Sequence, residues 1–126
     1  MDDSLSCQLF MTRSPMLRLE EIRKQISARL TVSPKPLKVI LFGSYARGTP
    51  HPDSDIDLVV ILNKEGKSDS YRTMINHRME ILRRLRELKK KHPMDILVYT
   101  KDEWEELKAS GSSFIERIES DGVTIL

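Results

Sequence analysis

The chain of 126 residues contains a single cysteine, Cys7, so no disulfide can form within it. This sparing use of cysteine is typical of proteins in a reducing compartment. No apolar run approaches the roughly 20 residues that a membrane-spanning helix needs, and the N-terminus lacks the basic start and apolar stretch of a signal peptide. These absences predict a cytoplasmic protein that makes no membrane contact.

The chain also has few potential zinc ligands and a small net charge. Three histidines are present, and none stands at the spacing of a structural zinc site from another histidine or a cysteine. The 21 basic and 19 acidic residues give a net charge of +2, too small to predict a nucleic-acid partner. A chain of this length forms one domain. We expect residues 16–126 to form it and residues 1–15 to be a mobile N-terminal arm.

The segment from Gly43 to Val60 reads G-S-Y-A-R-G-T-P-H-P-D-S-D-I-D-L-V-V and is the part of the chain richest in chemical signals. Before it, Leu37–Phe42 is an apolar run that predicts a mostly buried strand. Gly43 allows a sharp turn at the strand's end and lets a ligand approach the backbone. Ser44 is a good N-cap for a helical turn that contains Arg47, and the free N–H groups of such a turn attract phosphate.

Two carboxylates open the next predicted strand, which runs to Leu62. Asp55 and Asp57 are two residues apart, so in a strand they face the same side, with Cα atoms about 6.5 Å apart. Such a pair of oxygen donors can hold Mg²⁺. Asp95 opens a third apolar strand, Ile96–Tyr99, and pairing of the two strands would let it complete the metal site and accept a proton. Taken singly, these aspartates could also be ordinary turn and strand-edge residues.

The combined pattern of G-S-x-A-R-G, S-D-I-D-L-x-V, a helix and an aspartate that opens an apolar strand resembles the minimal nucleotidyltransferases of the DNA polymerase β-like superfamily, often called MNT proteins. The resemblance covers about Leu37 to Thr100. It implies that Gly43 and Ser44 hold the triphosphate of the incoming nucleotide. It also implies that Asp55 and Asp57 bind two Mg²⁺ ions. Asp95 would complete the metal site and serve as the candidate catalytic base.

Arg47 matches the arginine of the family's motif. Whether it contacts phosphate or braces the loop is open at this point. The simpler interpretation, that Arg47 is a surface ion-pair member and Ser44 only a helix cap, is open as well.

The resemblance also implies a function. We expect transfer of a nucleoside monophosphate, AMP from ATP, to an acceptor hydroxyl with release of pyrophosphate. MNT proteins resemble the antitoxin half of two-gene modules whose partner is an all-helical HEPN ribonuclease toxin, so the implied acceptor is a tyrosine hydroxyl of that toxin. The alternative is a non-catalytic antitoxin that neutralises its partner by contact. In either case the protein would work in a homo- or hetero-oligomer.

The spacing of apolar residues in the rest of the chain predicts the helices and strands around the site. Leu17–Leu30 is predicted to be a helix with an apolar stripe. Ser70–Lys91 is predicted to be the longest helix, and its basic face is either solvated surface or a contact for RNA or an acidic partner. Thr100 is predicted to cap a helix over Lys101–Ala109, followed by a short helix and a last strand at Val123–Leu126. We therefore expect an α/β (α+β) fold: a small mixed β-sheet with helices packed mainly on one face, the site at one sheet end and, by resemblance, a polymerase β-like nucleotidyltransferase core.

Overall fold

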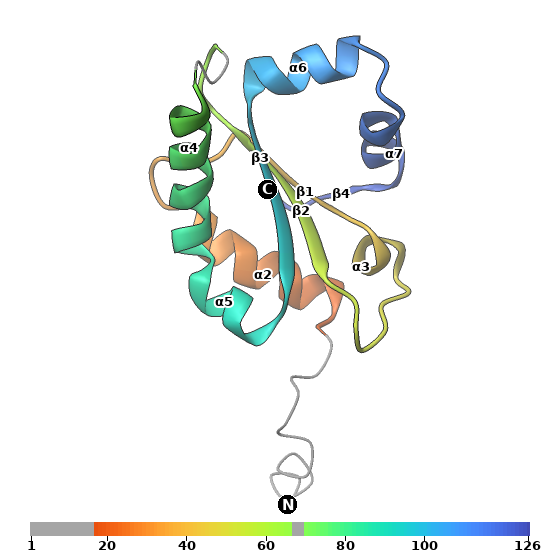
Figure 1. The fold of residues 1–126 in the computed structure, drawn as a ribbon. Helices are drawn as coiled ribbons and strands as arrows, with labels where there is room; N and C mark the ends of the chain where they lie inside the picture. Colours follow the sequence, from red (N-terminus) through yellow and green to blue (C-terminus); the bar gives the residue numbers. More distant parts are fainter. Residues whose placement is uncertain (1–16, 67–69) are drawn as a thin grey trace, which may run out of the picture.

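The computed structural model describes residues 17–66 and 70–126 (Figure 1). The predicted N-terminal arm, residues 1–15, lies outside the described residues. No helix in the described ranges has the length and apolar content that a bilayer crossing requires. Along the described chain the elements are α2 (Leu19–Leu30), β1 (Lys38–Phe42), α3 (Ser44–Arg47), β2 (Ile56–Leu62), α4 (Tyr71–Arg84), α5 (Arg86–Lys91), β3 (Met94–Thr100), α6 (Lys101–Ala109), α7 (Ser113–Asp121) and β4 (Val123–Thr124).

The strands of the described residues form one mixed sheet in the order β3-β2-β1-β4. β1 runs antiparallel to both β2 and β4, whereas β2 and β3 are parallel. The parallel pair is connected through α4 and α5, as a parallel crossover requires. The predicted mixed sheet is therefore confirmed. Its parallel pair is new information, because short apolar runs do not indicate the direction of pairing.

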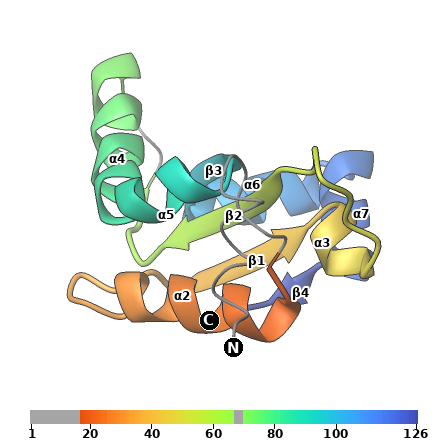
Figure 2. The ribbon, with the colours of Figure 1, turned by 90° about the horizontal axis from the view of Figure 1, so that it is seen from below.

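Helices pack on both faces of the sheet. Alternation along β2 sends Leu58 and Val60 into one core with α2, α4 and α5, and Val59 and Ile61 into a second core with α6 and α7. Figure 1 shows α4 and α5 to the left of the sheet, α2 across its lower part, α6 at the top and α7 to the right, and Figure 2 shows the fold from below. The α/β class is as predicted. The larger helix group, α2, α4 and α5, covers one face of the sheet. The second face is partly covered by α6 and α7, because β2 is apolar on both sides.

The single helix predicted over Ser70–Lys91 is divided into two by a bend at Leu85. The backbone of Leu85 has φ −98° and ψ 6°, outside the α-helical values, so α4 ends before it and α5 begins after it. The bend keeps Ile81, Leu85 and Leu88 in one core. It also directs the chain toward the start of β3 (Figure 1).

Other boundaries fall close to the predicted ones. The first helix begins at Leu19 rather than Leu17. α6 has the predicted bounds, and Thr100 and Glu103 form a capping box in which each side chain accepts the other residue's backbone N–H. β4 is shorter than predicted, but the N–H of Ile125 still donates to the Val39 carbonyl at 2.7 Å. Because Ile125 is also buried, the apolar C-terminus packs against the sheet.

Candidate active site

Three strands contribute residues to one end of the sheet. β1 ends there at Phe42, while β2 and β3 both start there, because β1 is antiparallel to β2 and β3 is parallel to it. The register pairs Phe42 with Asp57 and Asp57 with Asp95. Residues paired across neighbouring strands share a face and lie about 5 Å apart. The strand pairing on which the site prediction depended is therefore present.

Gly43 lies between β1 and α3, against the carboxylate of Asp57. Its backbone has φ 80° and ψ −159°, a combination that glycine adopts without strain and other residues rarely adopt. A Cβ atom built on Gly43 would overlap with Oδ2 of Asp57. Glycine is therefore needed for two reasons: the turn itself, and the space that the carboxylate occupies.

Ser44 does not cap the helix, contrary to the sequence-based expectation. The N-cap of the short helix α3 is Gly43, and Ser44 is its first helical residue. The Ser44 hydroxyl donates to Oγ of Ser54 at 2.9 Å, and the same oxygen accepts the backbone N–H of His51 at 2.9 Å. These bonds tie α3 to the loop that leads into β2 and so fix the approach to Asp55.

Asp55 and Asp95 act electrostatically on Asp57. Asp57 is half-buried, whereas Asp55 and Asp95 are exposed. Burial raises the pKa of Asp57, the charges of Asp95 and then Asp55 raise it further, and the charge of Arg47 lowers it. These neighbouring like charges disfavour the ionised form of Asp57. A cation at this end of the sheet would relieve that repulsion.

The donor set suits Mg²⁺, which prefers carboxylate, water and phosphate oxygens. Within residues 17–66 and 70–126, no group of three or more His, Cys, Asp or Glu side chains is gathered as a ready-made metal site. Magnesium sites commonly combine one or two carboxylates with phosphates of the substrate. The assignment of Asp55, Asp57 and Asp95 as metal ligands and catalytic residues, and of Gly43, Ser44 and Arg47 to the nucleotide, stays a prediction.

A cavity of about 180 Å³ lies beside Asp57 and brings α7 to the site. From β1, β2 and α3 it is lined by Phe42, Gly43, Arg47 and Asp57. From α7 it is lined by Phe114, Arg117, Ile118 and Asp121. Phe42 and Phe114 meet edge to face, with ring centroids 5.8 Å apart. The exposed Arg117 is a second arginine at this cavity, besides Arg47.

The sequence alone did not reveal this contribution of α7. The sequence predicts only a short helix after Lys101–Ala109 and does not connect that helix with the site. A signal was present, because residues 114, 117, 118 and 121 follow the spacing of one helix face and this face includes an arginine. The sequence does not show, however, that this face lies against the end of the sheet.

Residues 19–123 match the family model of the nucleotidyltransferase domain. The chain belongs to this family. The matched range includes the candidate site and every described helix, so the predicted enzyme class, a nucleotidyltransferase, is confirmed by the family match.

Solved structures show the same fold for this nucleotidyltransferase. One is a protein from Sulfolobus solfataricus assigned to the nucleotidyltransferases, with 20% identity, a TM-score of 0.51, and coverage of 84% of this chain and 77% of that chain. Another is a toxin-antitoxin structure with AMP-PNP, with 22% identity, a TM-score of 0.54, and coverage of 82% and 72%. At these identities the likeness establishes the fold alone. No curated protein sequence gives a significant match.

Proposed function

We propose that this nucleotidyltransferase transfers AMP from ATP to a hydroxyl group of a helical HEPN-type toxin and thereby acts as its antitoxin. The observation that carries the proposal is the position of the Asp57 carboxylate, which lies against Gly43 and beside Asp95 at the end of the sheet. The family match supports nucleotidyl transfer. The toxin-antitoxin structure with AMP-PNP has a similar fold and supports the choice of nucleotide and partner.

In the proposed reaction the acceptor oxygen attacks the α-phosphorus of ATP, pyrophosphate leaves, and the hydroxyl proton passes to Asp95. Asp95 is exposed at the start of the outer strand β3, so it is accessible to a hydroxyl on another protein. Two Mg²⁺ ions, held by Asp57 with Asp55 and Asp95, would neutralise charge on the phosphates and lower the pKa of the attacking hydroxyl when bound. Alignment and electrostatic stabilisation would provide most of the acceleration.

The triphosphate would lie along the Gly43 turn and Ser44. Arg47 and Arg117 line the same cavity as Gly43, so both can offset phosphate charge. The exposed ring of Phe114 gives this cavity an apolar side on which a base can stack. The nucleotide would thus be held between the start of β2 and α7.

Arg117→Ala is expected to raise KM for ATP about tenfold, with a smaller change in kcat. A hydrogen bond to a charged group contributes about 1.5 to 3 kcal/mol, and about 1.4 kcal/mol corresponds to a factor of ten. Steady-state kinetics with ATP as the varied substrate measures this effect. The matched control is Glu116→Ala, an exposed neighbour on α7 that does not line the cavity. Equal KM values in the two variants would show that α7 does not hold the nucleotide.

Asp57→Asn is expected to stabilise the metal-free protein at neutral pH. The pKa of Asp57 is raised above the ordinary value of 3.8 in the folded state, so the folded protein holds this proton more tightly than the unfolded chain does. The contribution of Asp57 to stability therefore falls as pH rises through the raised pKa. The Tm advantage of Asp57→Asn over the wild type should be small at acidic pH and grow as the pH rises.

Thermal unfolding in EDTA at several pH values measures that advantage, and a repeat in Mg²⁺ tests the metal site. Mg²⁺ should stabilise the wild type but not Asp57→Asn, because a ligand stabilises only the form that binds it. A wild type more stable than Asp57→Asn in EDTA at neutral pH, or an equal effect of Mg²⁺ on both proteins, would count against the proposed site.

A non-catalytic antitoxin that acts by contact alone is the alternative. Carboxylates that repel one another are unfavourable for the stability of the fold, and residues of this kind are typical of sites kept for chemistry. The raised pKa of Asp57, caused by burial and by Asp95 and Asp55, favours the enzyme over this alternative.

Parallel reactions with α-labelled and γ-labelled ATP test the transfer. The protein and Mg²⁺ are incubated with each nucleotide and with a helical protein encoded by an adjacent gene. Label from the α-position on the helical protein, with none from the γ-position, is expected because pyrophosphate leaves. Transfer of the γ-label would identify a phosphoryl transferase instead, and the absence of both labels would overturn the proposal.

A further inference from the structure

The outer side of α4 carries apolar side chains that pack into neither core. Tyr71 is 77% exposed, Met74 49%, Ile75 38% and Met79 50%. Ile81 of the same helix is only 2% exposed, so the core side of α4 is distinct from this outer side. Large apolar side chains gathered at one surface are typical of sites that contact another molecule.

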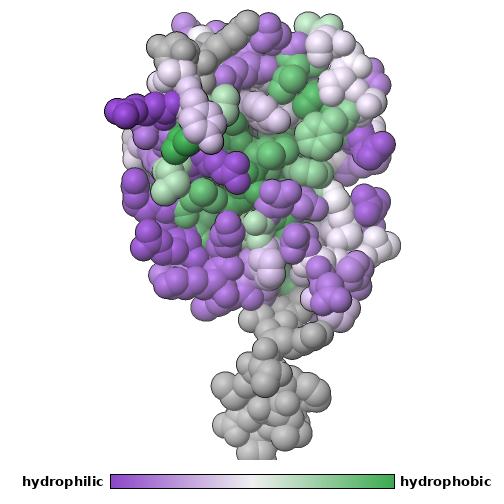
Figure 3. All heavy atoms as spheres, viewed as in Figure 1, coloured by the Kyte–Doolittle hydropathy of each residue, from purple (hydrophilic) through white to green (hydrophobic). Residues whose placement is uncertain are grey.

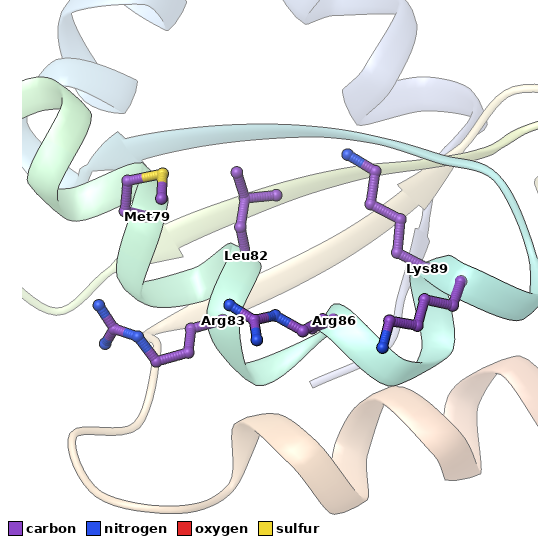
Figure 4. A pocket seen from close by; sticks show the side chains of 6 residues that line it. Met79, Leu82, Arg83, Arg86 and Lys89 are labelled. Atoms are coloured by element: carbon purple, nitrogen blue, oxygen red, sulfur yellow. The ribbon is translucent and has the colours of Figure 1, made fainter.

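A groove of about 340 Å³ continues from this outer side along the end of α4 and α5. We call it the basic groove, and its lining is Met79, Leu82, Arg83, Arg86, Lys89 and Lys90. Figure 4 shows Met79, Leu82 and Lys89 in a row on the side of the strands, and Arg83 and Arg86 on the side of α2. The groove therefore combines apolar side chains with neighbouring cations.

The outer edge of the sheet is open at the same surface. β3 is the last strand in the order and, in the part of the chain that the structure describes, pairs with β2 alone. Leu97, Val98 and Tyr99 of β3 are only half-buried. Figure 3 shows apolar side chains gathered in the middle of this face, with hydrophilic ones around them. An open strand edge readily pairs with another chain, and apolar residues around it favour such a contact.

Charge indicates which kind of molecule fits this surface. Residues 71–91 hold eight basic and two acidic side chains. Both acidic residues already have partners, since Glu80 pairs with Arg84 at 3.1 Å and Glu87 with Lys90 at 3.5 Å. Lys90 is one of four groove cations, and among residues 17–66 and 70–126 no ion pair neutralises the other three, Arg83, Arg86 and Lys89. The groove is therefore left with excess positive charge.

The excess positive charge distinguishes between the molecules that could bind in the groove. A second copy of the chain would bring like charges into contact, which disfavours association. A nucleic acid would satisfy the cations but would leave the apolar side chains of α4 uncovered, and the groove itself has no aromatic lining on which bases could stack. An acidic protein surface with an apolar centre satisfies both features.

We propose that the basic groove and the outer side of α4 dock an amphipathic helix of a partner protein, one whose apolar stripe is flanked by Asp and Glu. Its apolar side chains would pack on Met79 and Leu82, and its carboxylates would pair with the groove cations. α5 is followed directly by β3, so a partner bound here lies next to the strand that begins with Met94 and Asp95. The docking surface itself does not depend on the proposed function. Only the identification of this partner with the acceptor of AMP rests on it.

Two synthetic helical peptides test the chemistry of the proposed partner against the full chain. Both carry leucine at i, i+3, i+4 and i+7, and the flanking positions are glutamate in one and lysine in the other. Fluorescence anisotropy is expected to show binding of the glutamate peptide and about tenfold weaker binding, or none, of the lysine peptide.

Surface variants locate the binding. Arg83→Glu/Arg86→Glu and Met79→Asp should each weaken binding of the glutamate peptide about tenfold or more. The matched control is Lys24→Glu, a charge reversal at an exposed position of α2 outside the groove, which should bind like the wild type. All four positions are exposed, and unchanged thermal unfolding of each variant checks that it folds.

Several results would overturn the docking proposal. These are no binding of the glutamate peptide, equal binding of both peptides, or wild-type binding by Arg83→Glu/Arg86→Glu. A dimer in sedimentation velocity that Met79→Asp dissociates would assign the surface to a second copy, and displacement of the peptide by an RNA oligonucleotide would assign it to nucleic acid. Asp57→Asn should bind the glutamate peptide like the wild type, so failure of the docking surface and failure of AMP transfer appear in separate measurements.

Discussion

Replacement of Asp57 by asparagine is expected to lower the rate of nucleotidyl transfer about a thousandfold, the loss expected when a main electrostatic contributor to an active site is removed. Asp57 is the half-buried member of the three carboxylates and lies against Gly43. A neutral amide has the same shape but cannot neutralise Mg²⁺. The fold should therefore persist while the charge proposed to hold the cation is lost, and a rate measurement with saturating ATP and Mg²⁺ tests this.

The matched control for this variant is Asp53→Asn. Asp53 is an exposed aspartate in the loop before β2. The same chemical change there should leave the rate within about twofold, because surface changes away from a site have small effects. Retention of more than about a tenth of the wild-type rate by Asp57→Asn would show that Asp57 does not hold the catalytic metal.

Replacement of Gly43 by alanine is expected to damage both stability and catalysis. The backbone conformation with φ 80° and ψ −159° costs about 1 to 3 kcal/mol for a residue with a side chain. The added Cβ would also displace the Asp57 carboxylate, which it would otherwise overlap. Since a shift of about 1 Å can cost a factor of about 100 in rate, we expect at least that loss in kcat. Chemical denaturation and initial-rate assays measure the two effects.

Gly48→Ala separates the cost of the backbone from the displacement of the carboxylate. Gly48 also has a positive φ, 76°, but a Cβ built there meets nothing within 4 Å. We expect it to lose about 1 to 2 kcal/mol of stability for a left-handed conformation and to keep a rate near that of the wild type. Equal losses of rate in Gly43→Ala and Gly48→Ala would show that the glycine at position 43 is needed only for the turn.

A double variant gives a second check on the same contact. In Gly43→Ala/Asp57→Ala the added methyl group no longer meets a carboxylate. If the steric conflict is real, the double variant will be more stable than the sum of the two single changes in the free energy of unfolding predicts. Additive losses would indicate that the two residues do not influence each other.

Local signals in the sequence predicted the elements that local interactions determine. The bounds of α6 were correct because Thr100 and Glu103 form a capping box that is visible in the sequence. The strand predicted over Asp55–Leu62 begins one residue later, at Ile56, and was recognisable because it is rich in apolar residues and the turn before it is rich in Pro, Asp and Ser. The sequence also predicted that Asp57 and Asp95 lie next to each other, on the assumption that their two strands pair.

Features that depend on distant contacts were not predictable from the sequence. The bend at Leu85 depends on burial of three residues in a core formed by several elements. The hydrogen bond from Ser44 to Ser54 links residues ten positions apart, and it replaced the helix cap that Ser44 would provide in isolation. The position of Arg117 at the cavity depends on where α7 packs, and a helical pattern specifies a face but not the surface that the face meets.

The most direct measurement combines labelling with inhibition. The protein, Mg²⁺ and α-labelled ATP are incubated with the proposed toxin partner, and both the label on that partner and its remaining toxin activity are recorded for the wild type and for Asp57→Asn. We expect the wild type to label and inactivate the toxin, and Asp57→Asn to do neither. Full inhibition by Asp57→Asn, with no label on the toxin in either reaction, would contradict catalysis and identify an antitoxin that acts by contact alone.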